Sequence, residues 1–127
     1  MSKYNHCHYI LEGKIPKEVS IFEWAKWFEE ERDKRKVKRT KLSNGTIIST
    51  VFLGVDLGFS SDKPLLFESM VFGEEYECME RYSNFDESIN GHNKIVKELL
   101  KNGVCIIEED GKIKEYTKFN RFEIMDI

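Results

Sequence analysis

The sequence is poor in the features that usually mark secreted, membrane-spanning and multidomain proteins. Its three cysteines are an odd number and lie far apart along 127 residues, so they do not indicate a disulfide framework. Only two prolines are present, and the chain shows no internal repeat, low-complexity linker, signal peptide or long apolar segment. These absences predict a single domain over residues 1–127, without a membrane segment, in the reducing cytoplasm.

Several motifs that would name a chemistry are also missing. There is no glycine-rich phosphate loop, no nucleophile elbow and no paired-cysteine motif. His6, Cys7 and His8 are consecutive, and in an extended segment their side chains alternate in direction, so they cannot all reach one ion. We therefore predict no catalytic residue, no metal site and no cofactor, and a protein that is not an enzyme is favoured.

The composition supports one hydrophobic core. Hydrophobic residues make up 40% of the chain and aromatic residues 13%, and the apolar residues come in clustered runs. The formal net charge is −3, with a basic N-terminal half and an acidic C-terminal half. This balance does not favour a nucleic-acid-binding protein.

Two amphipathic helices are predicted. Ser20 and Glu23 have the spacing of a capping box, so the first helix begins at Ile21. Its core-facing residues are predicted to be Ile21, Trp24, Ala25 and Phe28, with Trp27 at the margin. The second helix follows an N-cap at Ser83 or Asn84 and ends before Asn102-Gly103. Its apolar stripe consists of Phe85, Ile89, His92, Val96, Leu99 and Leu100.

Short apolar runs separated by turns predict an antiparallel sheet. Asn44-Gly45 indicates a type I′ hairpin between strands near 37–42 and 46–55. Further strands are predicted at 9–11, 65–72, 76–82, 104–107 and 113–116, the last two joined by a turn at 109–112. The predicted fold class is α+β: a single domain, mainly an antiparallel β-sheet meander, with two α-helices packed on one face.

Isolated polar residues within apolar segments are the candidate site: Thr50, Asp56, Glu68, Arg81 and His92. A turn between Glu74 and Glu75 would place Glu68 opposite Arg81, either as an ion pair that fixes strand register or as an oriented anion anchor. Whether Thr50 shares a face with Glu68 depends on a strand register that the sequence does not fix. Asp56 is either a loop cap or part of an acid/base pair, and His92 either a core residue or, with Gly91, a pocket wall.

One strong charge run is present, with seven basic residues in ten positions: Arg32, Lys34, Arg35, Lys36, Lys38, Arg39 and Lys41. It could bind phosphates or an acidic protein. The favoured interpretation is an exposed helix end that leads into an edge strand protected by lysines, because no aromatic residues are interleaved.

The chain resembles a family of small, uncharacterised proteins of tailed phages and prophages. The resemblance covers about half the chain, in blocks at 22–28, 48–56, 64–73, 81–83 and 91–92. It implies a phage origin and little chemistry. Family members often have Asp-His where this chain has Asp56-Leu57, and the missing histidine makes acid/base or metal chemistry there less favourable.

Two functions remain open at this stage. The first is a phage-encoded protein, in the cytoplasm of the infected or lysogenic host, that binds a host protein or a defence component. The alternative is a small enzyme or a protein that binds a small ligand or nucleotide, with an anionic ligand in a pocket around Thr50, Asp56, Glu68, Arg81 and His92.

Overall fold

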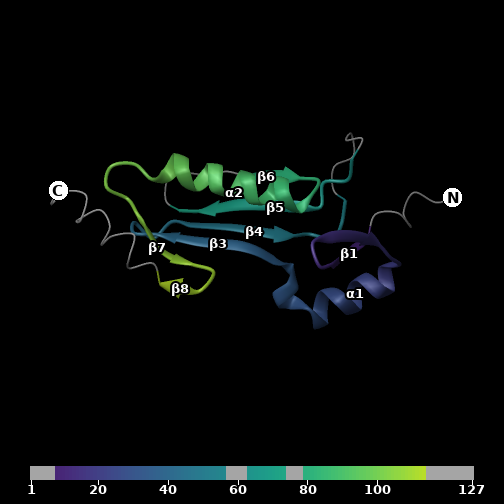
Figure 1. Ribbon diagram of the computed structural model, residues 1–127. Coiled ribbons are helices and arrows are strands. Elements are labelled where there is room, and N and C mark those ends of the chain that lie inside the picture. The colour runs from purple at the N-terminus through teal and green to yellow at the C-terminus, as the bar shows by residue number, and fades with distance from the viewer. Residues whose placement is uncertain (1–7, 57–62, 74–78, 114–127) are drawn as a thin grey trace.

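The computed structural model describes residues 8–56, 63–73 and 79–113 (Figure 1). Its helices are α1 (Ile21–Glu30), the short 3-10 helix η2 (Arg32–Arg35) and α2 (Phe85–Leu99). Its strands are β1 (Tyr9–Glu12), β2 (Ile15–Glu18), β3 (Lys36–Leu42), β4 (Ile47–Phe52), β5 (Phe67–Phe72), β6 (Met79–Tyr82), β7 (Ile106–Glu109) and β8 (Lys112–Ile113).

Six of the strands form one antiparallel sheet in the order β6-β5-β4-β3-β7-β8. Strands β3 to β6 follow one another as a meander, and β7 pairs with the other side of β3 after the chain has passed through α2. β1 and β2 form a separate two-stranded sheet. The predicted α+β class with a mainly antiparallel sheet is confirmed.

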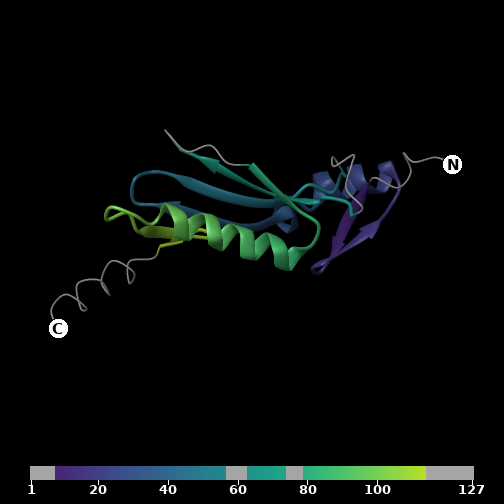
Figure 2. The same ribbon diagram turned by 90° about the horizontal axis from the view of Figure 1, so that it is seen from above.

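The two helices lie in different places relative to this sheet. α2 runs along one face of the large sheet, whereas α1 and the β1–β2 hairpin lie together at one end of it (Figures 1 and 2). α2 contacts β3, β4, β5 and β6, and α1 contacts β1 and η2. The opposite end of the molecule carries the β7–β8 hairpin.

α2 begins where the sequence predicts. Asn84 caps the helix, and its side-chain oxygen accepts a hydrogen bond from the backbone N–H of Glu87 at 2.8 Å. Beyond the helix end, Asn102 and Gly103 both have positive φ angles. The buried stripe differs slightly from the prediction, since Ser88 and Ile95 are buried and Leu100 is 37% exposed.

α1 also begins as predicted, but its predicted core face is only partly correct, since Trp24 and Phe28 are half-buried and the other two residues are not. Ser20 caps the helix by accepting from the backbone N–H of Glu23. No residue of α1 is buried, however, and Ile21 and Ala25 are exposed. The reason is that α1 packs beside the β1–β2 hairpin at the end of the sheet. Trp27 makes the clearest contact with the core, edge-on to the ring of Phe52.

The loop between β3 and β4 is not the predicted type I′ turn. Gly45 has a φ of 90°, but Asn44 does not have a positive φ, which a type I′ turn would require. The N–H of Gly45 donates to the carbonyl of Leu42, and the N–H of Leu42 donates to the carbonyl of Thr46. These bonds define a three-residue loop with a left-handed glycine. A turn with two positive φ angles occurs instead at Asp110-Gly111, between β7 and β8.

Two further strand predictions need correction. Residues 15–18 form strand β2, although no strand was predicted between residues 11 and 37. β3 is not an edge strand along residues 40–42, because β7 pairs there with the side that β4 leaves free. Lys41 therefore does not protect a sheet edge, whereas Lys36 and Lys38 precede the part of β3 that pairs with β7.

The core consists of two apolar clusters under α2. One comprises Leu42, Ile48, Val71, Ile95 and Val96. The other comprises Leu11, Phe52, Leu66 and Phe67. Between the Ile48 and Phe52 positions of β4 lies Thr50, which is 1% exposed and belongs to a layer of buried polar side chains.

Candidate functional site

His92 is the centre of the buried polar layer. Its Nε2 atom lies 2.8 Å from the Thr40 hydroxyl oxygen, and its Nδ1 atom lies 2.7 Å from the Thr50 hydroxyl oxygen. The hydroxyl groups of Thr50 and Ser69 are in turn hydrogen-bonded to each other. These four side chains come from β3, β4, β5 and α2, and each is at most 1% exposed. A hydroxyl group can donate or accept, so either neutral tautomer of the ring satisfies the network.

Burial lowers the pKa of His92 from 6.5 to about 4. Desolvation of the charged ring is the main cause, and the positive charge of Lys38 acts in the same direction, against a smaller opposing influence of Asp110. The ring is thus neutral at physiological pH. A neutral histidine with both nitrogen atoms hydrogen-bonded in a closed layer fits the interpretation of His92 as a core residue.

Glu68 and Arg81 form the predicted ion pair across β5 and β6. The two residues are register partners, and Arg81 Nε donates to Glu68 Oε2 at 3.1 Å. The turn predicted between Glu74 and Glu75 also implies pairing of Met70 with Met79, which the structure has. It further implies pairing of Phe72 with Glu77, but Glu77 lies outside the described residues.

The β4–β5 register separates this ion pair from His92. Thr50 pairs with Ser69, and Val51 pairs with Glu68. Because side chains alternate along a strand, Thr50 points toward α2 and Glu68 points to the other face of the sheet. The sequence left this register open, and the structure has the register that places Thr50 and Glu68 on opposite faces.

Asp56 lies beyond the end of β4, and its side chain hydrogen-bonds to the backbone. Its Oδ1 atom accepts a hydrogen bond from the N–H of Leu65 at 3.2 Å, which fits the interpretation as a loop cap. The structure therefore divides the five candidate residues among three places. It brings Thr50 together with His92 and Glu68 together with Arg81, but it does not bring all five around one pocket.

Gly91 allows strand β6 to approach α2 closely. A Cβ atom at this position would lie 2.2 Å from the Tyr82 hydroxyl oxygen and 2.3 Å from its ring. The sequence indicated that a strand or a ligand comes close here, and the neighbour is a strand residue.

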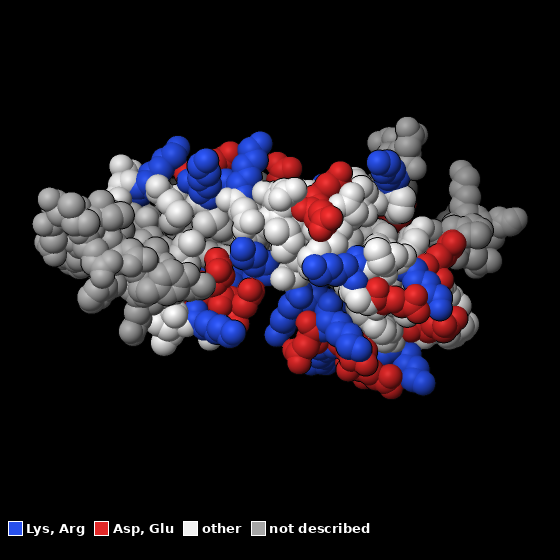
Figure 3. All heavy atoms as spheres, viewed as in Figure 1, with Lys and Arg blue, Asp and Glu red and all other residues white. Residues whose placement is uncertain are grey.

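The basic run does not form one continuous patch. Lys38 bonds to Asn93 of α2 at 2.8 Å, Arg39 pairs with Glu108 at 2.9 Å, and the guanidinium of Arg35 lies over the ring of Phe28. Basic and acidic side chains alternate over the region where α1 leads into β3 (Figure 3). Lys34 and Lys36 line a cleft that none of the other basic residues of this run reaches.

We call this hollow the lysine cleft. It has a volume of about 710 Å³ and lies where the β1–β2 turn, η2, the start of β3 and the first residue of α2 meet. Its lining residues are Leu11, Glu12, Gly13, Lys14, Lys34, Lys36 and Phe85. The sequence pointed to Lys34 and Lys36 within the basic run, but it did not reveal that Lys14 and Phe85 join them.

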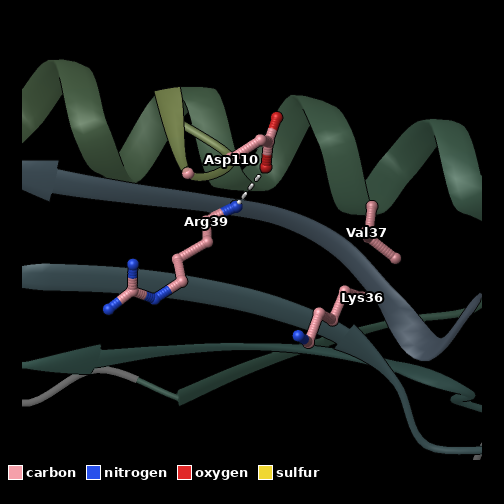
Figure 4. Close-up of a pocket in the computed structure, with 5 residues that line it drawn as sticks. Lys36, Val37, Arg39 and Asp110 are labelled. Atoms are coloured by element: carbon pink, nitrogen blue, oxygen red, sulfur yellow. Dashed lines mark hydrogen bonds between the residues drawn. The ribbon is translucent and has the colours of Figure 1, made fainter. Parts of the chain in front are cut away.

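A smaller pocket of about 460 Å³ lies on the other side of Lys36, lined by Lys36, Val37, Arg39, Asp110 and Gly111. Asp110 Oδ1 accepts a hydrogen bond from the backbone N–H of Arg39 at 2.8 Å, while the Arg39 side chain points away from Asp110 (Figure 4). This hydrogen bond joins the β7–β8 turn to β3.

Two further features are absent from the described residues. Among residues 8–56, 63–73 and 79–113, no three His, Cys, Asp or Glu side chains are grouped so that they could hold a metal ion. In the same residues, no helix is long and apolar enough to cross a membrane.

The comparisons with known proteins give one similarity. The chain is 31% identical over 84 residues to the petrobactin-binding protein YclQ of Bacillus subtilis (strain 168). The matched region is 62% of this chain but only 26% of that protein. No protein-family model matches the chain, and no solved structure matches it significantly. The similarity therefore concerns a part of a longer binding protein.

Proposed function

We propose that this chain binds a small ligand, and that the lysine cleft is its binding site. The observation that carries the proposal is the cleft itself, whose volume of about 710 Å³ is in the range of small-molecule sites. It lies at the junction of four elements, so that its walls are held by both sheets and by α2. The similarity to part of a petrobactin-binding protein supports the same class of function.

The lysine cleft contains none of the residues that the sequence predicted for a small-ligand site. Thr50 and His92 are sealed between the sheet and α2, and a ligand would have to separate these layers to reach them. In the lysine cleft, the ammonium groups of Lys34 and Lys36 are accessible, with side chains 62% and 72% exposed. A ligand can therefore bind there without disturbing the core.

Petrobactin is the first ligand to test, because it is what the similar protein binds. The expected result is a saturable change in the amide resonances of Gly13, Lys14 and Phe85 when the ¹⁵N-labelled protein is titrated. The amides of Ser49 and Met70, on the sheet face away from α2, are the internal control. A titration with petrobactin and then with a general metabolite library that leaves the cleft resonances unchanged would contradict the proposal.

The prediction of a phage protein that binds a host protein stays a prediction, and one observation favours it. The sheet face opposite α2 carries exposed apolar side chains on β5 and β6, with Phe72 52% and Met79 58% exposed. Exposed apolar groups of this kind are what a protein partner would cover. Phe72→Ser with Met79→Ser should then abolish the biological effect in infected cells while leaving the domain folded. An unchanged effect would count against this second function.

A further inference from the structure

We infer that the ligand of the lysine cleft is a small polyanion with an apolar ring or chain attached. The inference rests on the proposed function, since it names the chemical class that the same site would select. It follows from how charge and apolar surface are distributed in the cleft.

Three lysines line the cleft, from two segments of the chain. Lys14 belongs to the β1–β2 turn, whereas Lys34 in η2 and Lys36 at the first position of β3 belong to one continuous segment. Because Lys14 comes from a different segment than Lys34 and Lys36, the three lysines do not merely follow one exposed helix face. A ligand with two or more negative groups can contact several of them at once.

The acidic groups near the cleft compensate these charges only weakly. Among the described residues that line the cleft, Glu12 is the one carboxylate, and it already pairs with Lys17, outside the cleft, at 3.4 Å. Lys34 and Lys36 each have one carboxylate at 3.5 Å, from Glu31 and Asp33. Exposed pairs of this kind are worth roughly 0 to 1 kcal/mol, so an anionic ligand can replace them at small cost.

The apolar part of the cleft is formed by Leu11 and Phe85. Both belong to or pack against the apolar cluster around Phe52, which fixes their positions. The ammonium group of Lys14 lies 5.2 Å from the centre of the Phe85 ring, so cationic and aromatic surfaces are adjacent. A ligand that carries both negative charge and an apolar ring would match both surfaces.

Three probes separate these contributions: ATP, which has both features, tripolyphosphate, which has only the charge, and adenosine, which has only the ring system. Titrations of the ¹⁵N-labelled protein should show the cleft amides shifting with ATP and, at higher concentration, with tripolyphosphate. Adenosine should cause no shift at the same concentrations. The affinity for ATP should fall as salt is raised.

The variant Lys14→Gln with Lys34→Gln and Lys36→Gln should weaken ATP binding by roughly tenfold or more, as expected for three partly exposed ion pairs. The matched control is Lys94→Gln with Lys97→Gln and Lys101→Gln, which changes the net charge equally at exposed positions outside the cleft. The control should bind ATP as the unchanged protein does. Equal weakening in both triple variants would show a general charge effect and overturn the inference.

Other outcomes distinguish this inference from the proposed function. Adenosine binding in the cleft as tightly as ATP would overturn the polyanion class but keep the small-ligand site. Petrobactin binding that is unaffected by the Lys14, Lys34 and Lys36 substitutions would do the same. If none of the three probes shifts the cleft amides, the inference fails, and the petrobactin and metabolite titrations alone decide the proposed function. Tighter binding of an oligothymidylate than of ATP would indicate a nucleic-acid surface and overturn both.

Discussion

The imidazole of His92 and the hydroxyl group of Thr50 join α2 to the centre of the sheet through a hydrogen bond of 2.7 Å in a fully buried layer. On one side of this layer lies the cluster around Ile48, and on the other lies the cluster around Phe52. A buried polar group that lacks its partner costs about 1 to 3 kcal/mol. The layer therefore favours the one position of α2 in which all its hydrogen bonds are made.

Acidification should destabilise the protein through His92. Its pKa is about 4 in the folded state and close to 6.5 in the unfolded chain. Between these values the unfolded state binds a proton that the folded state does not, so the free energy of unfolding falls as the pH falls. The contribution of this residue should be complete above pH 6.5 and should decrease by roughly 3 kcal/mol by pH 4. Urea denaturation at pH 7, 6, 5 and 4.5 measures this change.

The control for this prediction is His92→Gln, which keeps a side chain able to hydrogen-bond but cannot titrate. The variant should be less stable at pH 7, because it cannot reproduce both ring contacts. Its free energy of unfolding should nevertheless depend less steeply on pH between 6.5 and 4.5 than that of the unchanged protein. Identical slopes for the two proteins would show that His92 is not the group responsible.

The parts of the fold that the sequence predicted correctly depend on local interactions. The cap of α2 needs only Asn84 and Glu87, and the cap of α1 needs only Ser20 and Glu23. Glu68 and Arg81 pair between two strands that follow each other in the chain. Such features are determined by residues a few positions apart or by a single short connection.

The predictions that were wrong concern features determined by contacts between distant segments. The exposure of Ile21 results from the β1–β2 hairpin, which places α1 at the end of the sheet, and the interior position of β3 results from pairing with β7 some 70 residues later. The candidate site was divided for a similar reason. The register between β4 and β5 places Glu68 on the face opposite Thr50. The sequence of the loop between these two strands carries no pattern from which this register could be predicted.

Removing both members of the Glu68–Arg81 pair should affect stability much less than removing one. Arg81→Met alone leaves Glu68, which is 8% exposed, without its 3.1 Å partner, and should cost about 1 to 3 kcal/mol. Glu68→Leu with Arg81→Met replaces the pair by apolar contact, and its stability should lie close to that of the unchanged protein. Thermal and urea denaturation of the three proteins measure the difference. Ligand binding in the lysine cleft should persist in the double variant, because neither residue lines the cleft.

A double variant as unstable as Arg81→Met would contradict this interpretation. It would mean that the charges themselves, and not only their mutual pairing, are needed on this face. A stable double variant that loses its biological effect would instead assign Arg81 the role of an anion anchor for a partner. The two measurements thus separate the structural role of the pair from a functional one.

Gly91→Ala should destabilise the protein even though alanine is the better helix former. On helix propensity alone, the substitution would stabilise α2 by about 1 kcal/mol. The new methyl group, however, would lie 2.2 to 2.3 Å from the hydroxyl and ring of Tyr82, so the Tyr82 side chain, β6 or α2 must shift. Overpacking of this kind typically costs about 1 to 3 kcal/mol, which exceeds the gain.

Asn90→Ala, at an exposed position of the same helix, is the matched control and should not be destabilising. Combining Gly91→Ala with Tyr82→Ala should make the added methyl group neutral or favourable relative to Tyr82→Ala alone, whereas an equal penalty in both backgrounds would show that the contact with Tyr82 is not what requires glycine here.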